Sequence, residues 1–136
     1  MVIHTDGAAR GNPGPAGIGA LIRREDGQVL AEISRFLGHA TNNVAEYTAL
    51  IIALEKAAAL GATEVEVFTD SELMVKQIHG EYRVKNEGLK PLYQKVQELA
   101  AGFRSFDITH VAREKNKEAD RLANRGIDEG LQKSKG

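Results

Sequence analysis

The stretch Ile3-His4-Thr5-Asp6-Gly7 places a carboxylate at the end of a short apolar segment. Residues 2–5 have the composition of a β-strand, and the Gly- and Pro-rich run at 10–15 predicts a turn soon after it. Because an unpaired buried carboxylate is costly, a central strand that ends at Asp6 requires a partner for that charge. Three more acids adjoin apolar runs elsewhere in the chain, and these are Glu46, Asp70 and Asp120.

The length of 136 residues and the hydrophobic content of 42% predict one globular domain with an ordinary apolar core. We assign this domain to residues 1–128 and expect the polar residues 129–136 to form a flexible C-terminal tail. No internal repeat is present. The sequence offers no clear oligomer interface, so we expect a monomer.

Cysteine is absent, which excludes disulfides and thiolate metal sites and is typical of a reducing cytoplasm. No apolar run approaches the roughly 18 residues of a membrane span, and no secretion signal opens the chain. We therefore expect a cytoplasmic protein that does not associate with membranes. The formal net charge of −1 lacks the basic excess that is common among nucleic-acid-binding proteins, so any such role depends on local basic residues.

The first half of the chain predicts three strands and a helix. Strands at 17–23 and 29–37 are joined by the hairpin signal Asp26-Gly27, and with the first strand they form an antiparallel meander. The pair of glycines at 17 and 19 indicates a close approach of another backbone. A helix follows from the N-cap sequence 41–43 to about Leu60, and its nearly continuous apolar surface predicts a buried helix packed on the sheet.

The second half predicts two strands that return through helices. Strands are expected at 64–69 and 106–111, and helices at 71–79, at 88–101 and from Asn116 onward. The order βββαβααβα indicates an α/β fold with a five-stranded mixed sheet, three strands antiparallel and two parallel, flanked by helices. Sites in such sheets lie beyond the carboxyl ends of the parallel strands, which is where Asp6 and Asp70 fall.

Each acid also has an ordinary structural explanation. Asp70 is suited to capping a helix, Asp120 to the first turn of its own helix, and Asp6 to an Asx-turn. Glu46 is different, because helical spacing aligns it with Leu50 and other apolar residues that face the core. If the four carboxylates converge, a cation must offset their repulsion, and all-oxygen ligands favour Mg²⁺ with Mn²⁺ as a substitute. Two such ions about 4 Å apart are typical of phosphodiester hydrolysis, so the cluster indicates a nuclease or another phosphoryl-transfer enzyme.

Four ordered motifs resemble those of the type 1 ribonucleases H over about residues 2–127. They are Asp6-Gly7-Ala8-Ala9-Arg10-Gly11-Asn12-Pro13-Gly14, Thr41-Asn42-Asn43-Val44-Ala45-Glu46, Thr69-Asp70-Ser71 and Asn116-Lys117-Glu118-Ala119-Asp120-Arg121-Leu122-Ala123. The resemblance implies the ribonuclease H-like fold and a metal-dependent endonuclease that cuts the RNA strand of RNA/DNA hybrids, leaving 5′-phosphate and 3′-hydroxyl ends. It also implies that Asp6, Glu46, Asp70 and Asp120 hold two metal ions, with Asp6 bridging them, and that no small-molecule cofactor is needed.

The resemblance further implies residues that contact the hybrid. Asn12, Asn42 and Asn43 match positions that contact it, and an amide suits a 2′-hydroxyl or a base edge because it both donates and accepts hydrogen bonds. Arg23 and Thr41 match a pocket for a DNA phosphate. His110, ten residues before Asp120, matches a histidine that assists proton transfer or product release. The alternative is that His110 ends the last strand and Arg113 reaches the phosphate. The remaining substrate-binding positions are Gly7, Ser71, Glu72 and Asn116.

Two departures from the family pattern affect substrate binding. Glu72 replaces a common glutamine and can only accept hydrogen bonds when ionised. The connector 80–86, with Arg83 and Lys85, stands where many bacterial members insert a basic helix, so we predict weak binding with strong salt dependence. Two alternatives stay open: a nuclease of the same fold that acts on double-stranded RNA or structured DNA, and a binding module without catalysis.

Overall fold

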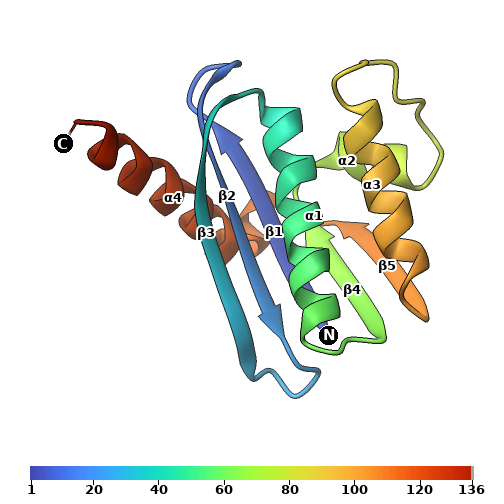
Figure 1. The fold of residues 1–136 in the computed structure, drawn as a ribbon. Coiled ribbons are helices and arrows are strands. Elements are labelled where there is room, and N and C mark those ends of the chain that lie inside the picture. The colour runs from blue at the N-terminus through green and yellow to red at the C-terminus, as the bar shows by residue number, and fades with distance from the viewer. Residues whose placement is uncertain (136) are drawn as a thin grey trace.

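The computed structural model describes residues 1–135 and confirms the predicted element order (Figure 1). The elements are β1 (Val2–Ala9), β2 (Gly14–Arg23), β3 (Val29–Ala40), α1 (Asn42–Ala59), β4 (Glu64–Thr69), α2 (Glu72–Ile78), α3 (Lys90–Ala101), β5 (Ser105–His110), the short 3₁₀ helix η1 (Arg113–Lys115) and α4 (Lys117–Lys135). The sheet order is β3-β2-β1-β4-β5, with β1 to β3 antiparallel and β1, β4 and β5 parallel. Within this part of the chain, no helix is both long and apolar enough to span a membrane.

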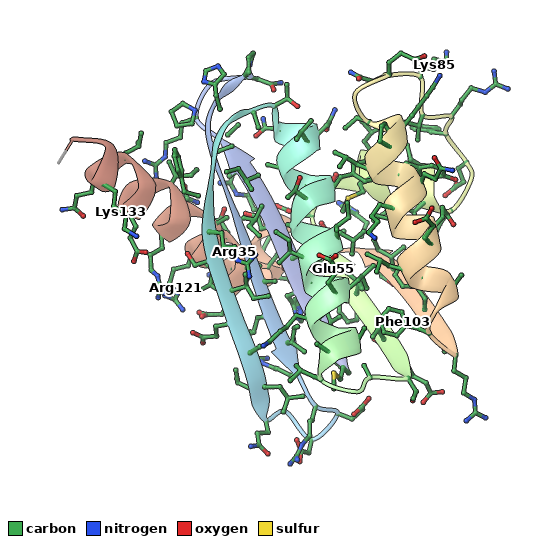
Figure 2. All side chains as sticks on the ribbon, in the orientation of Figure 1. Arg35, Glu55, Lys85, Phe103, Arg121 and Lys133 are labelled. Atoms are coloured by element: carbon green, nitrogen blue, oxygen red, sulfur yellow. The ribbon has the colours of Figure 1, made fainter. Side chains whose placement is uncertain are left out.

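Helices cover both faces of the sheet. In Figure 1, α1 and α3 lie in front of it, and α4 passes behind it and extends beyond the edge strand β3. The main core lies between α1 and the sheet, where Leu50 and Leu54 pack with Ile3, Ile18 and Val67, all fully buried. Figure 2 shows Glu55 on the opposite, exposed side of α1. The helix is therefore buried along its sheet-facing side, as its apolar composition predicts.

The glycines of β2 allow α4 to lie directly on the sheet. A Cβ atom at Gly17 or Gly19 would clash with backbone atoms of α4, including the carbonyl oxygens of Ala123 and Ala119 respectively. The close approach that the sequence predicts is thus an approach of a helix to a strand. It brings the start of α4, with Asp120, against the strand that pairs with Asp6.

Several boundaries differ from the predicted ones: β2 begins three residues earlier, at Gly14, β3 ends three residues later, at Ala40, and the largest differences lie at the end of β1 and in the C-terminal segment. β1 continues past Thr5 to Ala9, because its antiparallel pairing with β2 extends as far as Ala9 opposite Ala16. At the other end, the tail expected from residue 129 is helical, since α4 continues to Lys135. Gly130 is buried, and an added Cβ there would clash with the Phe36 ring on β3, so this part of α4 still packs on the sheet.

Candidate metal centre and nucleic-acid groove

The strand register brings Asp6 and Asp70 together. Parallel pairing between β1 and β4 ends at Thr5 opposite Thr69, and the residues that follow these two threonines are Asp6 and Asp70. Asp6 stays within the sheet, paired with Gly19 of β2, and only 4% of its surface is exposed. The parallel strand ends therefore hold two carboxylates next to each other, as the topology predicts.

Glu46 reaches the same point from α1 through a contact with Gly7. The backbone N–H of Gly7 donates a 2.7 Å hydrogen bond to Glu46 Oε1. A Cβ at Gly7 would clash with the backbone of Ala45 and Glu46, so only glycine permits this approach of the helix. Glu46 is 9% exposed, which confirms that its side chain faces inward.

The three carboxylates form a compact cluster that favours protons or cations. One oxygen from each of Asp6, Glu46 and Asp70 lies within 4.8 Å of the others. Burial, followed by repulsion from Glu46 and Asp70, raises the pKa of Asp6 to about 10. Burial and the charge of Asp70 raise the pKa of Glu46 to about 8, although the Gly7 hydrogen bond opposes this shift. Asp70 Oδ1 is buried without a hydrogen-bond partner among residues 1–135, so the site fits a bound cation with oxygen ligands.

Asp120 lies beside the cluster at the start of α4, and it is more exposed than Asp6 and Glu46. The carboxyl of Asp120 interacts with that of Asp6 and contributes to the raised pKa of Asp6. Asp120 Oδ1 lies 3.5 Å from Arg113 Nη2 and accepts a 3.3 Å hydrogen bond from Asn124 Nδ2. One oxygen of this carboxylate is thus held by cationic and amide donors of the chain itself.

Arg10 and Asn124 are site residues that sequence reasoning missed. Asn124 Nδ2 also donates to the Asp120 carbonyl oxygen at 3.0 Å, and Asn124 Oδ1 accepts from Arg10 Nη2 at 3.3 Å. Arg10 Nη1 donates to Asp128 Oδ1 at 2.7 Å, so the turn after β1 is tied to two successive turns of α4. The spacing of Asp120, Asn124 and Asp128 at four-residue intervals was the signal available in the sequence, because such residues share one helix face.

The carboxylates lie in an open groove of about 440 Å³. Five residues predicted to bind substrate also line it, namely Gly7, Asn42, Asn43, Ser71 and Arg113. The other lining residues, besides the four acids, are Ala8, Ala9, Arg10 and Asn124. The groove therefore combines an acidic floor with amide, hydroxyl and guanidinium groups on its sides.

Local hydrogen bonds fix the start of α1 beside the groove, and their side chains come from Asn12, Thr41 and Asn42. Asn12 Oδ1 accepts from the Asn42 backbone N–H at 3.1 Å, and Asn42 Oδ1 accepts from the Ala9 N–H at 2.8 Å. Thr41 Oγ1 accepts from the Val44 N–H at 3.2 Å and caps α1. Ser71 caps α2 in the same way, through the Met74 N–H at 3.3 Å. These side chains fix the first turns of two helices beside the carboxylates.

The structure separates Arg23 from Thr41 and thereby corrects the single phosphate pocket predicted for them. Arg23 is at the end of β2 that pairs with Val2 and Val29, whereas Thr41 follows Ala40, which pairs with Gly14 at the opposite end of β2. Matching residues to family positions does not give their separation in space, which here is set by the length of β2. The two residues belong to different sites.

Three further predicted residues do not line the groove. Asn116 is 2% exposed, and its Nδ2 donates to the Thr5 carbonyl oxygen at 2.8 Å. Glu72 forms an ion pair with Lys76 at 2.9 Å, which lowers the pKa of its carboxyl. His110 is exposed at the last position of β5, opposite Thr69, which matches the alternative in which it ends the strand.

Comparison with known proteins places this geometry in a family. Residues 4–126 match the family model described as reverse transcriptase-like. RNase H1 from the archaeon Halobacterium salinarum has a solved structure with a TM-score of 0.91 and 44% identity, covering 94% of this chain and 97% of that one. The chain belongs to the type 1 ribonuclease H family.

Two further matches support this assignment. LC11-RNase H1, solved in complex with an RNA/DNA hybrid, has a TM-score of 0.91 and 47% identity, covering 96% of this chain and 98% of that one. The bifunctional protein Rv2228c of Mycobacterium tuberculosis is 49% identical over 133 residues, covering 97% of this chain. The chain spans only 36% of the length of that protein, so the ribonuclease H unit is about a third of the first curated relatives.

Proposed function

We propose that this ribonuclease H domain is an endonuclease that hydrolyses the RNA strand of RNA/DNA hybrids with two divalent metal ions and leaves 5′-phosphate and 3′-hydroxyl ends. The observation that carries the proposal is the meeting of carboxylates from β1, α1, β4 and α4 in one open groove. The hybrid bound to LC11-RNase H1, which shares 47% of its sequence with this chain, supports the substrate.

The donor set suits hard cations. Asp6, Glu46 and Asp70 would hold one metal ion, and Asp6 with Asp120 would hold a second. Oxygen ligands of this kind favour Mg²⁺, and Mn²⁺ is the expected substitute. When bound, such ions activate a water for attack on phosphorus and stabilise the departing 3′ oxygen.

The groove supplies polar groups for the nucleic acid around this centre. Asn42 and Asn43 lie at the start of α1 beside the carboxylates. Asn42 uses its oxygen to accept from Ala9, so its amide nitrogen is the group that stays available for a 2′-hydroxyl. Asn43 is exposed and offers both functions of its amide. We assign the sensing of RNA to these two residues.

Arg113 is the residue that we assign to the phosphate next to the cleaved bond. Its side chain is 76% exposed and lines the groove, and its Nη2 lies 3.5 Å from Oδ1 of Asp120. Arginine binds phosphate oxygens through paired donors, and this position places those donors beside the metal ligands. His110 at the end of β5 does not line the groove, so we assign the role to Arg113 in preference to His110.

A substrate panel tests this function. RNA/DNA hybrid, double-stranded RNA and double-stranded DNA of one sequence are incubated with the protein and Mg²⁺ or Mn²⁺, and the RNA ends are identified. We expect cleavage of the hybrid's RNA strand with 5′-phosphate ends. Cleavage of double-stranded RNA or DNA in preference to the hybrid would overturn the substrate, and hybrid binding without cleavage under either metal would indicate a binding module.

A further inference from the structure

A second, smaller cavity lies on the α4 side of the sheet. Its volume is about 170 Å³, and it shares no lining residue with the carboxylate groove. Strand residues form one wall and the segment from η1 into α4 forms the other; the lining residues are His4, Leu21, Arg23, Glu114, Lys115, Asn116, Lys117, Glu118 and Ala119. The cavity therefore contains Arg23 and Asn116, which the sequence had assigned to the substrate.

Three of its lining residues carry buried polar atoms without a hydrogen-bond partner in the described chain. These atoms are His4 Nδ1, Arg23 Nε and Asn116 Oδ1. Asn116 is the most constrained of the three, because the residue is 98% buried and its Nδ2 is already bonded to the Thr5 carbonyl oxygen. An unsatisfied buried polar group is destabilising, so three of them in one cavity indicate that it holds a polar occupant.

The charges and the size of the cavity define that occupant. Arg23, Lys115 and Lys117 outnumber Glu114 and Glu118, and Arg23 forms no ion pair within 4.0 Å among residues 1–135. An anion is therefore favoured. Pockets for drug-sized ligands have volumes of roughly 300–1,000 Å³, so this cavity is too small for a nucleotide and suits a single tetrahedral oxyanion.

The hydrogen-bonding atoms select among oxyanions. Arg23 Nε requires an acceptor, whereas Asn116 Oδ1 requires a donor. Inorganic hydrogen phosphate offers both, because it retains a proton at neutral pH while presenting ionised oxygens. Sulfate and a fully ionised phosphate monoester offer acceptors alone. We propose that this cavity is a binding site for inorganic hydrogen phosphate, held by Arg23 and Asn116 with His4 and the two lysines around it.

The position of the cavity connects it to the metal centre without making it part of the groove. His4 lies two residues before Asp6 on the same face of β1, and its ring stacks on Phe68 with centroids 5.2 Å apart. Asn116 holds the carbonyl oxygen of Thr5, the residue directly before Asp6. Phosphate in the cavity would therefore stabilise residues 4–6 of β1, which include the central carboxylate of Asp6.

To test the site, the metal-free, full chain is titrated with inorganic phosphate, and the side-chain and backbone amide resonances of Asn116, which remain in an Arg23 variant, are followed in ¹H–¹⁵N NMR spectra. We expect a saturable shift with a Kd at or below roughly 1 mM at pH 7.5. Sulfate and methyl phosphate, which offer acceptors alone when fully ionised, should bind at least 10-fold more weakly. Arg23→Gln should weaken phosphate binding at least 10-fold, and Lys115→Gln, at an exposed position, should weaken it about 3-fold.

Two matched variants separate this site from other basic groups. Arg24→Gln changes the neighbouring arginine, which is paired with Asp26 at 2.8 Å, and Arg113→Gln changes the arginine of the groove. Both should bind phosphate in this cavity with the wild-type Kd, because neither arginine lines it. Absence of a saturable shift, or equal binding by wild type and Arg23→Gln, would overturn the proposal and leave a water-filled cavity. Equal affinity for sulfate would overturn the role of Asn116 Oδ1. None of these outcomes depends on hydrolysis, so the phosphate site and the nuclease function succeed or fail separately.

Discussion

The Gly7 backbone N–H donates a 2.7 Å hydrogen bond to Oε1 of Glu46, and this contact joins β1 to α1 at the carboxylate cluster. The glycine has two roles here. Its missing side chain admits the backbone of Ala45, and its N–H orients one oxygen of the Glu46 carboxylate. Because Asp6 directly precedes Gly7, two consecutive residues supply the central carboxylate and the N–H group that orients Glu46.

Gly7→Ala should therefore damage stability and the site together. The added methyl group must displace the backbone of Ala45 and Glu46, and overpacking of this kind costs about 1–3 kcal/mol. We expect a lower melting temperature and at least 10-fold weaker Mg²⁺ binding by calorimetry. Gly102→Ala is the matched control, because its nearest neighbour would lie 3.3 Å away and it is remote from the carboxylates. Normal Mg²⁺ affinity in Gly7→Ala would contradict the assigned contact.

The carboxylate cluster should make the metal-free protein less stable as the pH rises. The pKa values of Asp6 and Glu46 are raised to about 10 and about 8, from their ordinary values of 3.8 and 4.5. At pH values between the ordinary pKa of the unfolded state and the raised pKa of the folded state, the folded protein holds protons that the unfolded protein releases. The free energy of unfolding therefore falls as the pH rises through this range. From about pH 5 to pH 8 we expect a loss of at least about 1.4 kcal/mol, the equivalent of one pKa unit. Chemical denaturation in EDTA measures it, and Mg²⁺ should restore the stability at pH 8.

Asp70→Asn provides the internal control for this pH dependence. Removing one charge relieves Asp6 and Glu46, so the metal-free variant should be more stable than wild type at pH 8 and should gain less from Mg²⁺. Asp107→Asn changes an exposed acid on β5 and should leave both effects unchanged. A wild-type stability that rises between pH 5 and pH 8 without metal would refute the repulsion among these groups.

Asn124 should act as a positioning residue for Asp120. It donates to the carboxylate Oδ1 and is itself held by Arg10, so Asn124→Ala frees the carboxylate without disturbing a helix-forming position. Loss of a group that orients a metal ligand commonly costs about 10–100-fold in affinity or activity. We expect a loss in that range in Mg²⁺ affinity measured by calorimetry, with an unchanged melting temperature in EDTA. Arg125→Gln, on the exposed side of the same helix, should retain wild-type affinity.

Arg113 and His110 can be distinguished by their variants. Arg113→Gln should lower kcat/KM on the hybrid by about 10–100-fold, the range expected for a charged hydrogen bond of about 1.5–3 kcal/mol. Arg113→Lys should recover part of this loss, because lysine keeps the charge without the paired donors. His110→Ala should stay within about 2-fold of wild type, and a larger loss there than in Arg113→Gln would reverse the assignment.

The sequence predicted those features that depend on local periodicity and strand order. The helical spacing of Glu46 with Leu50 correctly placed an acid on the buried side of α1, and the parallel order of β1 and β4 correctly placed Asp6 beside Asp70. Gly17 and Gly19 correctly indicated a close backbone approach, although only the structure identified α4 as the approaching element.

Features that depend on long-range geometry could not be obtained in the same way. Arg23 and Thr41 were assigned to one pocket, but the length of β2 separates them. The Arg10–Asn124 contact joins residues 114 positions apart, and no local pattern specifies which helix face meets the turn. The end of α4 was placed too early because the polar composition after Ile127 conceals the packing of Gly130 on Phe36.

The role of the four carboxylates is tested by Mg²⁺-dependent cleavage of the RNA strand of an RNA/DNA hybrid by wild type and by Asp70→Asn under single-turnover conditions. We expect cleavage by wild type that requires the metal, and a loss of at least about 10³-fold in the variant, whose folded state is verified by its melting temperature. Cleavage by Asp70→Asn at a rate near that of wild type would contradict the central claim that these carboxylates form the catalytic metal centre.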